Sequence, residues 1–184
     1  MRRRIWPIWV YYGIAVIVFL IDYASKKIIS RTVELDTERI PVLGDFFMIT
    51  HIRNRGAAFG MLQEQRLFFI VITIVVVGGI LWYLHRSYRT GTKLLLAALA
   101  TILGGAVGNF LDRARYGEVV DFLQFNFGSY TFPIFNLADT AICVGVGMVI
   151  LDALLTMKQE NKTNGNGEQS QEQSPEQSSG QQSV

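Results

Sequence analysis

Apolar residues gather in four long runs along the 184-residue chain. The runs extend from Ile5 to about Ile29, from Leu67 to Leu84, from Leu94 to Leu111, and from about Pro133 to Leu155. Each can cross a hydrocarbon core of roughly 30 Å, which takes about 20 helical residues. The second and third runs contain no charged residue, whereas a surface helix of a soluble protein keeps a polar face. The pattern therefore predicts an all-α membrane protein with four transmembrane helices.

The segment between the first two runs has another pattern. Residues 39–53 are rich in β-branched and aromatic side chains, and Gly44-Asp45 interrupts them. Such a stretch is typical of two short strands joined by a turn. We therefore expect a small β-hairpin at the membrane surface.

The last part of the chain is polar throughout. From Gln159 to Val184 it consists mainly of Gln, Ser, Glu, Asn and Gly and has no aromatic residue. Such a segment cannot bury enough apolar surface to fold. The sequence thus predicts a membrane domain at 1–158 and a disordered polar cytoplasmic tail at 159–184.

The distribution of basic residues predicts the orientation. The beginning of the chain resembles a secretory signal, but no small-x-small cleavage site follows its apolar stretch, so we expect a retained first span. Lys and Arg concentrate in three short segments, which favours a cytoplasmic location for those segments. Both termini are then cytoplasmic, and the first and third loops lie outside. The basic residues are Arg2, Arg3, Arg4, Arg86, Arg89, Lys93, Lys158 and Lys162.

Composition excludes several classes of protein. Half of the residues are apolar, 17% are charged, and the mean hydropathy is +0.28 despite the polar tail, which excludes an ordinary soluble domain. A net charge of +2 does not indicate a nucleic-acid partner. Cys143 is the single cysteine, so the chain has no intramolecular disulfide and no cysteine-cluster metal site. Its apolar surroundings favour a buried packing role.

Ionisable and amide side chains recur at one depth of the predicted bundle. Such groups are costly inside a membrane and therefore indicate a partner or a function. With the predicted orientation, all of them lie near the outer ends of spans one, three and four. They are Asp22, Lys26, Asn109, Asp112, Arg113, Asn136 and Asp139.

We hypothesise that two carboxyl groups in a site with little water form an acid–base pair. Counting from Pro133, Asp139 lies on the order of 9 Å into its helix and shares a face with Asn136. Asp121 follows Val119-Val120 in the short outer loop, within reach of the start of span four. Asp112 lies on the same helix face as Asn109. Two such carboxyl groups cannot both ionise cheaply, so one keeps a proton while the other activates water, as in aspartyl proteases. The residues alone leave open whether Asp112 or Asp121 is the second carboxylate.

Simpler interpretations apply to several of these residues. Asp22 and Lys26, at i and i+4, are more typical of an ion pair, and Asp112 next to Arg113 is more typical of a structural salt bridge. The glycines at 104, 105 and 108 favour close helix packing over phosphate binding. His51 has no second histidine nearby, which favours a surface or packing role over metal binding. For Asp139, without an obvious basic partner on its own helix, a functional role is favoured.

Other mechanisms lack their sequence signals. No His-Glu-x-x-His and no Gly-x-Ser-x-Gly string is present, which argues against zinc and serine membrane proteases. A presenilin-like aspartyl protease would carry Gly-x-Gly-Asp, but Leu137 precedes Ala138-Asp139. A proton-coupled transporter would favour internal repeats of the spans, and none is visible.

Four strings occur in order: Asn54-Arg-Gly-Ala-Ala-Phe-Gly60, Gly104-Gly-Ala-Val-Gly-Asn-Phe-Leu-Asp-Arg113, Val119-Val-Asp-Phe122 and Phe132-Pro-Ile-Phe-Asn-Leu-Ala-Asp139. Together they closely resemble the prokaryotic lipoprotein signal peptidases, or signal peptidase II. The resemblance implies a four-helix enzyme of the bacterial cytoplasmic membrane, with a small β-rich cradle and an active site near the outer face. Its substrate is a prolipoprotein carrying diacylglycerol on a cysteine, and cleavage falls just before that cysteine.

The resemblance also implies roles for particular residues. Asp121 and Asp139 match the catalytic aspartates, which act without metal or cofactor. We expect Asn54, Asn109 and Arg113 to hold the substrate backbone, and we expect a monomer. The matches to supporting polar residues are Asp22, Lys26, Asn54, Gly56, Asn109, Asp112, Arg113 and Asn136.

Overall fold

The structure is a computed structural model that describes residues 5–56 and 61–172, with side-chain burial as far as Gln159. Arg2, Arg3 and Arg4 of the predicted cytoplasmic segment, residues 57–60 of the Asn54–Gly60 string, and residues 173–184 of the predicted tail lie outside the described residues. The chain divides into two compact units, Met1–Val149 and Ile150–Val184, and all candidate site residues belong to the first. The boundary predicted at 158/159 stays a prediction.

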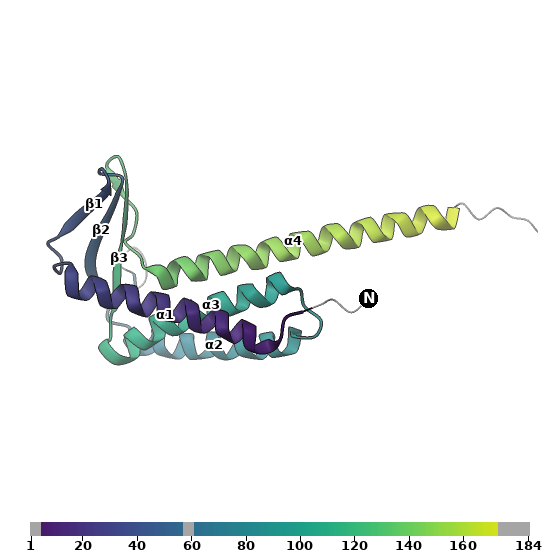
Figure 1. The fold of residues 1–184 in the computed structure, drawn as a ribbon, viewed down its shortest axis with the longest axis horizontal. Helices are drawn as coiled ribbons and strands as arrows, with labels where there is room; N and C mark the ends of the chain where they lie inside the picture. Colours follow the sequence, from purple (N-terminus) through teal and green to yellow (C-terminus); the bar gives the residue numbers. More distant parts are fainter. Residues whose placement is uncertain (1–4, 57–60, 173–184) are drawn as a thin grey trace, which may run out of the picture. The chain divides into compact units, whose positions relative to one another are not determined.

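Four helices of membrane-spanning length confirm the predicted fold class. They are α1 (Ile8–Thr32), α2 (Arg66–Ser87), α3 (Lys93–Tyr116) and α4 (Leu137–Glu172). In the part of the chain that the structure describes, α3 packs against both α1 and α2 (Figure 1). Its most apolar stretch is 56% buried, against 6% for that of α2, so α3 is central and α2 presents most of its apolar side chains outward.

Glycines allow the close packing around α3. A methyl group at Gly104 would lie 2.5 Å from the carbonyl oxygen of Ala15 on α1, and one at Gly105 would lie 2.5 Å from that of Ala138 on α4. At Gly108 it would meet the Asp22 carboxylate. The packing interpretation of these glycines is therefore confirmed, and the same contacts bring Asp22 and the start of α4 to one face of α3.

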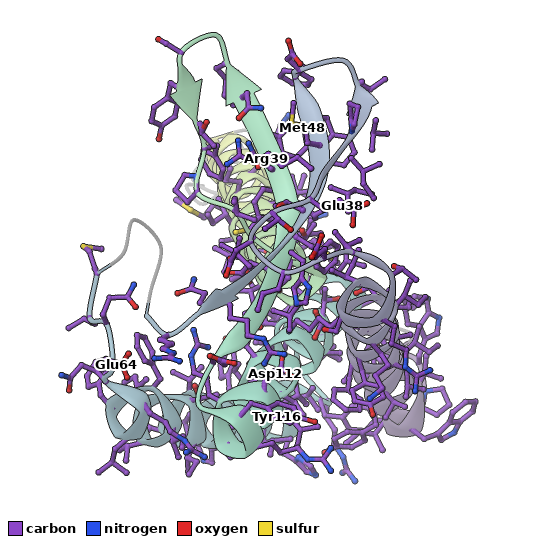
Figure 2. All side chains as sticks on the ribbon, turned by 90° about the vertical axis from the view of Figure 1, so that its left-hand side faces the viewer. Glu38, Arg39, Met48, Glu64, Asp112 and Tyr116 are labelled. Carbon is purple, nitrogen blue, oxygen red and sulfur yellow. The ribbon has the colours of Figure 1, made fainter. Side chains whose placement is uncertain are left out.

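A four-stranded antiparallel sheet, with the strand order β1-β2-β3-β4, lies beside the C-terminal ends of α1 and α3 (Figure 1). Its strands are β1 (Arg39–Leu43), β2 (Phe47–Asn54), β3 (Val119–Phe127) and β4 (Tyr130–Thr131). The first two confirm the predicted hairpin, and Gly44 supplies the left-handed φ of +51° in its turn. Figure 2 shows Arg39 and Met48 on the sheet, and Asp112 and Tyr116 near the end of α3.

Asp121 lies on a strand, where the sequence analysis predicted a loop. Gly117 ends α3 in the left-handed conformation, with φ +80°, and the chain turns directly into β3. The strand pairs with β2 so that Asp121 stands opposite Ile52. The prediction missed β3 because it used Val119-Val120 only as a link between spans, although Val, Phe and Leu continue to Phe127.

The fourth helix begins later and ends later than predicted. Pro133 belongs to a connecting segment in which Phe135 pairs with Leu123 of β3, so α4 begins at Leu137. Asp139 is therefore in the first turn of the helix and not deep inside it, and Asn136 precedes the helix. At the other end α4 continues through Gln159, where the sequence analysis starts its disordered tail, to Glu172. Gln, Glu and Lys favour helix, and extending an existing helix costs little.

Candidate active site

The polar residues predicted for the site form one connected cluster. They come from α1, β2, α3, β3, α4 and the segments next to β2 and α4, and hydrogen bonds and ion pairs link every member to another. The structure therefore brings together residues that are far apart in sequence. The cluster consists of Asp22, Lys26, Asn54, Gly56, Asn109, Asp112, Arg113, Asp121, Asn136 and Asp139.

Lys26 is a buried cation at the centre of the helical part of this cluster. Its Nζ lies 2.8 Å from a carboxylate oxygen of Asp22 and 2.8 Å from one of Asp112, and it donates to Asn109 Oδ1 at 2.9 Å. Only 4% of Lys26 and 1% of Asp22 are exposed, so these charges depend on one another. The predicted Asp22–Lys26 pair is confirmed. The predicted Asp112–Arg113 pair is wrong, because the Asp112 carboxylate reaches across to α1.

Side chains accept hydrogen bonds from three backbone amides at the start of α4. Asn136 Oδ1 accepts from the amide of Asp139 at 3.0 Å, and the Asp139 carboxylate accepts from the amide of Asn136 at 3.3 Å. This reciprocal arrangement is a capping box. The amide of Ala138 donates to Asp22 Oδ1 at 2.9 Å. The carboxylates of Asp22 and Asp139 thus both lie at the positive end of the α4 dipole, which stabilises negative charge there.

Asn109 connects Lys26 to Asp139. Its Nδ2 donates to Asp139 Oδ1 at 2.7 Å, while its Oδ1 accepts from Lys26 at 2.9 Å. Because the lysine occupies the amide oxygen, the amide nitrogen is directed at the carboxylate. Asn109 therefore fixes the orientation of Asp139.

Asp121 lies on the β3 side of the cluster and is 2% exposed. Asn136 Nδ2 donates to one of its carboxylate oxygens at 2.6 Å, and Asn54 Nδ2 donates to the other at 2.9 Å. Burial, followed by the nearby charge of Asp139, raises the pKa of Asp121 to about 7, against the lowering effect of the two amides. Near neutral pH this carboxyl group therefore exists in both protonation states.

Arg113 faces the two carboxylates from α3. Its guanidinium lies over the ring of Phe69 on α2, 4.6 Å from the ring centre, and its Nη2 donates to the Gly56 carbonyl at 3.2 Å. Its Nε is buried without a hydrogen-bond partner in the described parts of the chain. Gly56 in turn donates its amide to Asn54 Oδ1 at 2.9 Å. The cationic side chain is thus positioned and still has donor capacity.

A cavity of about 720 Å³ opens beside the cluster, and Asp121, Asp139 and Arg113 all line it. The rest of its wall is largely apolar and comes from α2, α4 and residues 132–135. Cys143, one helical turn beyond Asp139, is part of this wall and is exposed, so the predicted buried packing role is wrong. The cavity combines an acid–base pair with an apolar surface, which suits the hydrolysis of an amphiphilic substrate.

Some contributors were not predicted. Phe69 supplies the ring under Arg113, and Arg66 donates from the start of α2 to the carbonyls of Arg113 and Ala114 at 2.9 and 2.6 Å. Both contacts join α2 to the C-terminal end of α3. An aromatic residue and an arginine at a helix start are too common for the sequence to have signalled these roles. His51 is buried with its Nδ1 on the carbonyl of Val33, in agreement with a packing role.

The chain is similar to several known proteins. A family model described as signal peptidase (SPase) II matches residues 14–155. A lipoprotein signal peptidase of Bacillus pumilus (strain SAFR-032) is 46% identical over 153 residues, which cover 83% of this chain and 97% of that protein.

Two solved structures are also similar, each described as a bacterial membrane enzyme structure obtained by the in meso method. The first, at 2.3 Å resolution, has a TM-score of 0.74 and 32% identity, and the match covers 98% of this chain and 99% of the other. The second, at 1.9 Å resolution, has a TM-score of 0.71 and 35% identity and covers 84% and 97%.

Proposed function

Because the chain belongs to the signal peptidase II family, we propose that Asp121 and Asp139 are its two catalytic carboxylates. The chain is an aspartic endopeptidase that removes the signal peptide from prolipoproteins. One observation carries the assignment: Asn136 bonds to both carboxyl groups, with its amide nitrogen on Asp121 and its backbone amide on Asp139, and both line the same cavity. Asp112, the alternative second carboxylate, is occupied by Lys26.

The two carboxyl groups act as an acid–base pair. The ionised partner takes a proton from water, and the water oxygen attacks the scissile carbonyl carbon while the protonated partner gives its proton to the carbonyl oxygen. In the second step the carboxyl group that took the proton from water gives it to the leaving amine as the C–N bond breaks, and the other carboxylate takes a hydroxyl proton of the intermediate, so that a carboxylic acid forms. The raised pKa of Asp121 supports Asp121 as the partner that holds the proton.

The hydrogen bonds divide the supporting residues into two groups. The amides of Asn54 and Asn109 are directed at Asp121 and Asp139, so these residues position the carboxylates. Arg113 lines the cavity with unused donor capacity, which makes it the residue that holds a substrate carbonyl. The earlier expectation that all three hold the substrate is thus narrowed to Arg113.

The orientation of the enzyme follows from the distribution of charge, and the lipid on its substrate is what the resemblance to signal peptidase II implies. Both termini are cytoplasmic, and the site lies near the outer face of the membrane, because the basic segments flank the opposite ends of the helices. The substrate cysteine carries diacylglycerol, and its acyl chains lie along the apolar cavity wall from α2 and α4. The catalytic unit is residues 1–158 and acts as a monomer, with 159–184 as a polar cytoplasmic tail.

The test is cleavage of a precursor peptide by the purified protein. Asp121→Asn and Asp139→Asn should each lower turnover by about a thousandfold while the protein still inserts, because either change removes one half of the acid–base pair. Asp45→Asn, in the exposed hairpin turn, is the matched control and should cleave at the parent rate. Near-normal turnover by Asp139→Asn would contradict the assignment.

Peptides with and without the diacylglyceryl group test the substrate. Cleavage of the lipidated peptide alone supports the proposal. Equal cleavage of both peptides would favour an intramembrane protease of unmodified helices, and cleavage of neither would favour ion transport by the same carboxylates.

A further inference from the structure

Four charged side chains outside the catalytic cluster form an ionic group at the end of β2, which we call the Glu118 cluster: Arg53, Arg55, Glu64 and Glu118. Arg53 Nη1 lies 2.6 Å from Glu118 Oε1, and Arg55 Nε lies 3.2 Å from Glu118 Oε2. Arg55 Nη1 also lies 3.0 Å from Glu64, which Figure 2 shows near the start of α2. The Glu118 side chain is 14% exposed and that of Glu64 is 70% exposed. Glu118 is therefore the sheltered centre of the cluster.

The pleat of the sheet puts this cluster back to back with Asn54. Asn54 stands opposite Val119, and Arg53 stands opposite Val120. Since side chains alternate between the faces of a strand, Arg53 and Glu118 share one face, and Asn54, Ile52 and Asp121 share the other. Arg55 continues the alternation toward Glu118 and confirms it by its ion pair. Two neighbours of Asn54 are thus tied to one carboxylate on the far face.

This tie bears directly on the site. Asn54 donates to Asp121 at 2.9 Å and accepts from Gly56 at 2.9 Å, and Gly56 accepts from Arg113. These contacts require residues 53–56 to keep one backbone conformation across the point where β2 ends at Asn54. With both arginines bound to Glu118 on one face of the sheet, the Asn54 side chain between them lies on the other face, where Asp121 is.

We infer that Glu118 is a positioning residue for the peptidase reaction, acting through Arg53 and Arg55 to keep the amide of Asn54 on Asp121. The inference rests on the proposed role of Asp121. Burial raises the pKa of Glu118, and the hydrogen bonds from Arg53 and Arg55 lower it by more, so Glu118 is ionised at neutral pH and retains both partners.

Loss of the ion pairs from Arg53 and Arg55 to Glu118 should change the pH dependence of the reaction rate. The groups that act on Asp121 are Asp139 on α4, which raises its pKa, and Lys26 on α1, Asn136 and Asn54, which lower it; Arg113 on α3 also faces it. If Asn54 loosens, one lowering contact is lost and the proton is held to higher pH. The alkaline limb of the pH–rate profile, where the pair loses its proton, then moves upward.

The experiment compares Glu118→Gln with Glu64→Gln on a lipidated precursor peptide. Glu118→Gln should lower kcat by about threefold to tenfold with little change in KM, and should move the alkaline limb to higher pH. Glu64→Gln removes the exposed partner of Arg55 and should match the parent in both. An unchanged kcat and alkaline limb in Glu118→Gln, or equal changes in both variants, would overturn the inference.

A measurement on the parent enzyme covers the case in which Glu118→Gln does not fold. Salt screens ion pairs near the surface, so raising NaCl from about 0.05 M to 1 M should move the parent's alkaline limb in the same upward direction. A limb that stays in place would then overturn the inference. Normal turnover by Asp121→Asn would instead refute the proposed function, whatever the Glu118 variant does.

Discussion

Lys26 and Lys27 are neighbours in sequence with opposite environments. Lys26 lies between two carboxylates and is 4% exposed, whereas Lys27 is on the exposed side of α1. Removing one member of a buried ion network leaves the other charges without compensation, and such losses cost about 3–5 kcal/mol. The same change at an exposed lysine has little effect on stability.

Lys26→Met should therefore lower the thermal unfolding temperature strongly, because Asp22 and Asp112 lose their shared cation. Lys27→Met is the matched control and should unfold within about 0.5 kcal/mol of the parent. The measurement is thermal unfolding of both purified variants in the same detergent. Similar unfolding temperatures for the two variants would mean that the Lys26 network contributes nothing to stability.

Asp121 predicts how stability changes with pH. Its pKa rises from 3.8 to about 7 on folding, so the folded protein holds a proton that the unfolded chain releases. Between these pH values the free energy of unfolding therefore falls as pH rises, and the loss is complete above pH 7. The carboxyl group opposes folding in the alkaline range.

Asp121→Asn removes the pH-dependent contribution of this carboxyl group to the free energy of unfolding. Its unfolding temperature should decline less than that of the parent between pH 5 and 8, by on the order of 5 °C. Asp45→Asn, in the exposed turn, should follow the parent. Parallel curves for Asp121→Asn and the parent would show that burial does not perturb this carboxyl group.

Elements with a clear periodicity or composition were predictable from the sequence. The four spans and the β1–β2 hairpin follow from long apolar runs and from β-branched residues around Gly44. The strand β3 was missed because its pairing with β2 connects residues far apart in the chain, which local patterns do not show. The start of α4 was misplaced because Phe135 pairs with β3 instead of joining the helix.

Glycines on two helices predict opposite effects of the same substitution. Gly104→Ala places a methyl group 2.5 Å from a backbone oxygen of α1, so it should separate α1 from α3 and cost about 1–3 kcal/mol. Gly78→Ala on α2 meets nothing within 4 Å and should be neutral or stabilise by up to about 1 kcal/mol. Thermal unfolding of the two variants checks the difference. Equal stability would contradict close packing at Gly104.

For the whole molecule, the topology proposed here predicts which positions are reached from outside the cell. In a Cys143→Ala background, the cysteine of Asp45→Cys in the hairpin turn should react with a membrane-impermeant maleimide in intact cells. The cysteine of Arg89→Cys, in the segment between α2 and α3, should react only after permeabilisation. Reaction of the Arg89→Cys variant in intact cells would reverse the proposed orientation.

The depth of charged residues predicted which of them would meet, but not how they would pair. Asp22, Asp112 and Asp139 do meet at one end of the bundle, as the equal depth of their positions indicated. Their partners depend on which helix faces are in contact, and the sequence does not contain that information. Lys26 therefore forms ion pairs with both Asp22 and Asp112, although Arg113 is nearer to Asp112 in sequence.

The cap on α4 has a consequence for biosynthesis. Asp22 and the Ala138 amide that it accepts are 116 residues apart, on the first and the last helix. In a nascent chain Asp22 and Lys26 are translated early, and their spacing of four residues allows them to pair within α1 before their other partners exist. The cap and Asp139 arrive only when translation reaches α4. With Asp139 as a proposed catalytic carboxylate, a chain whose translation stops before residue 137 is expected to lack peptidase activity, and proteolysis is expected to begin only after α4 has been translated.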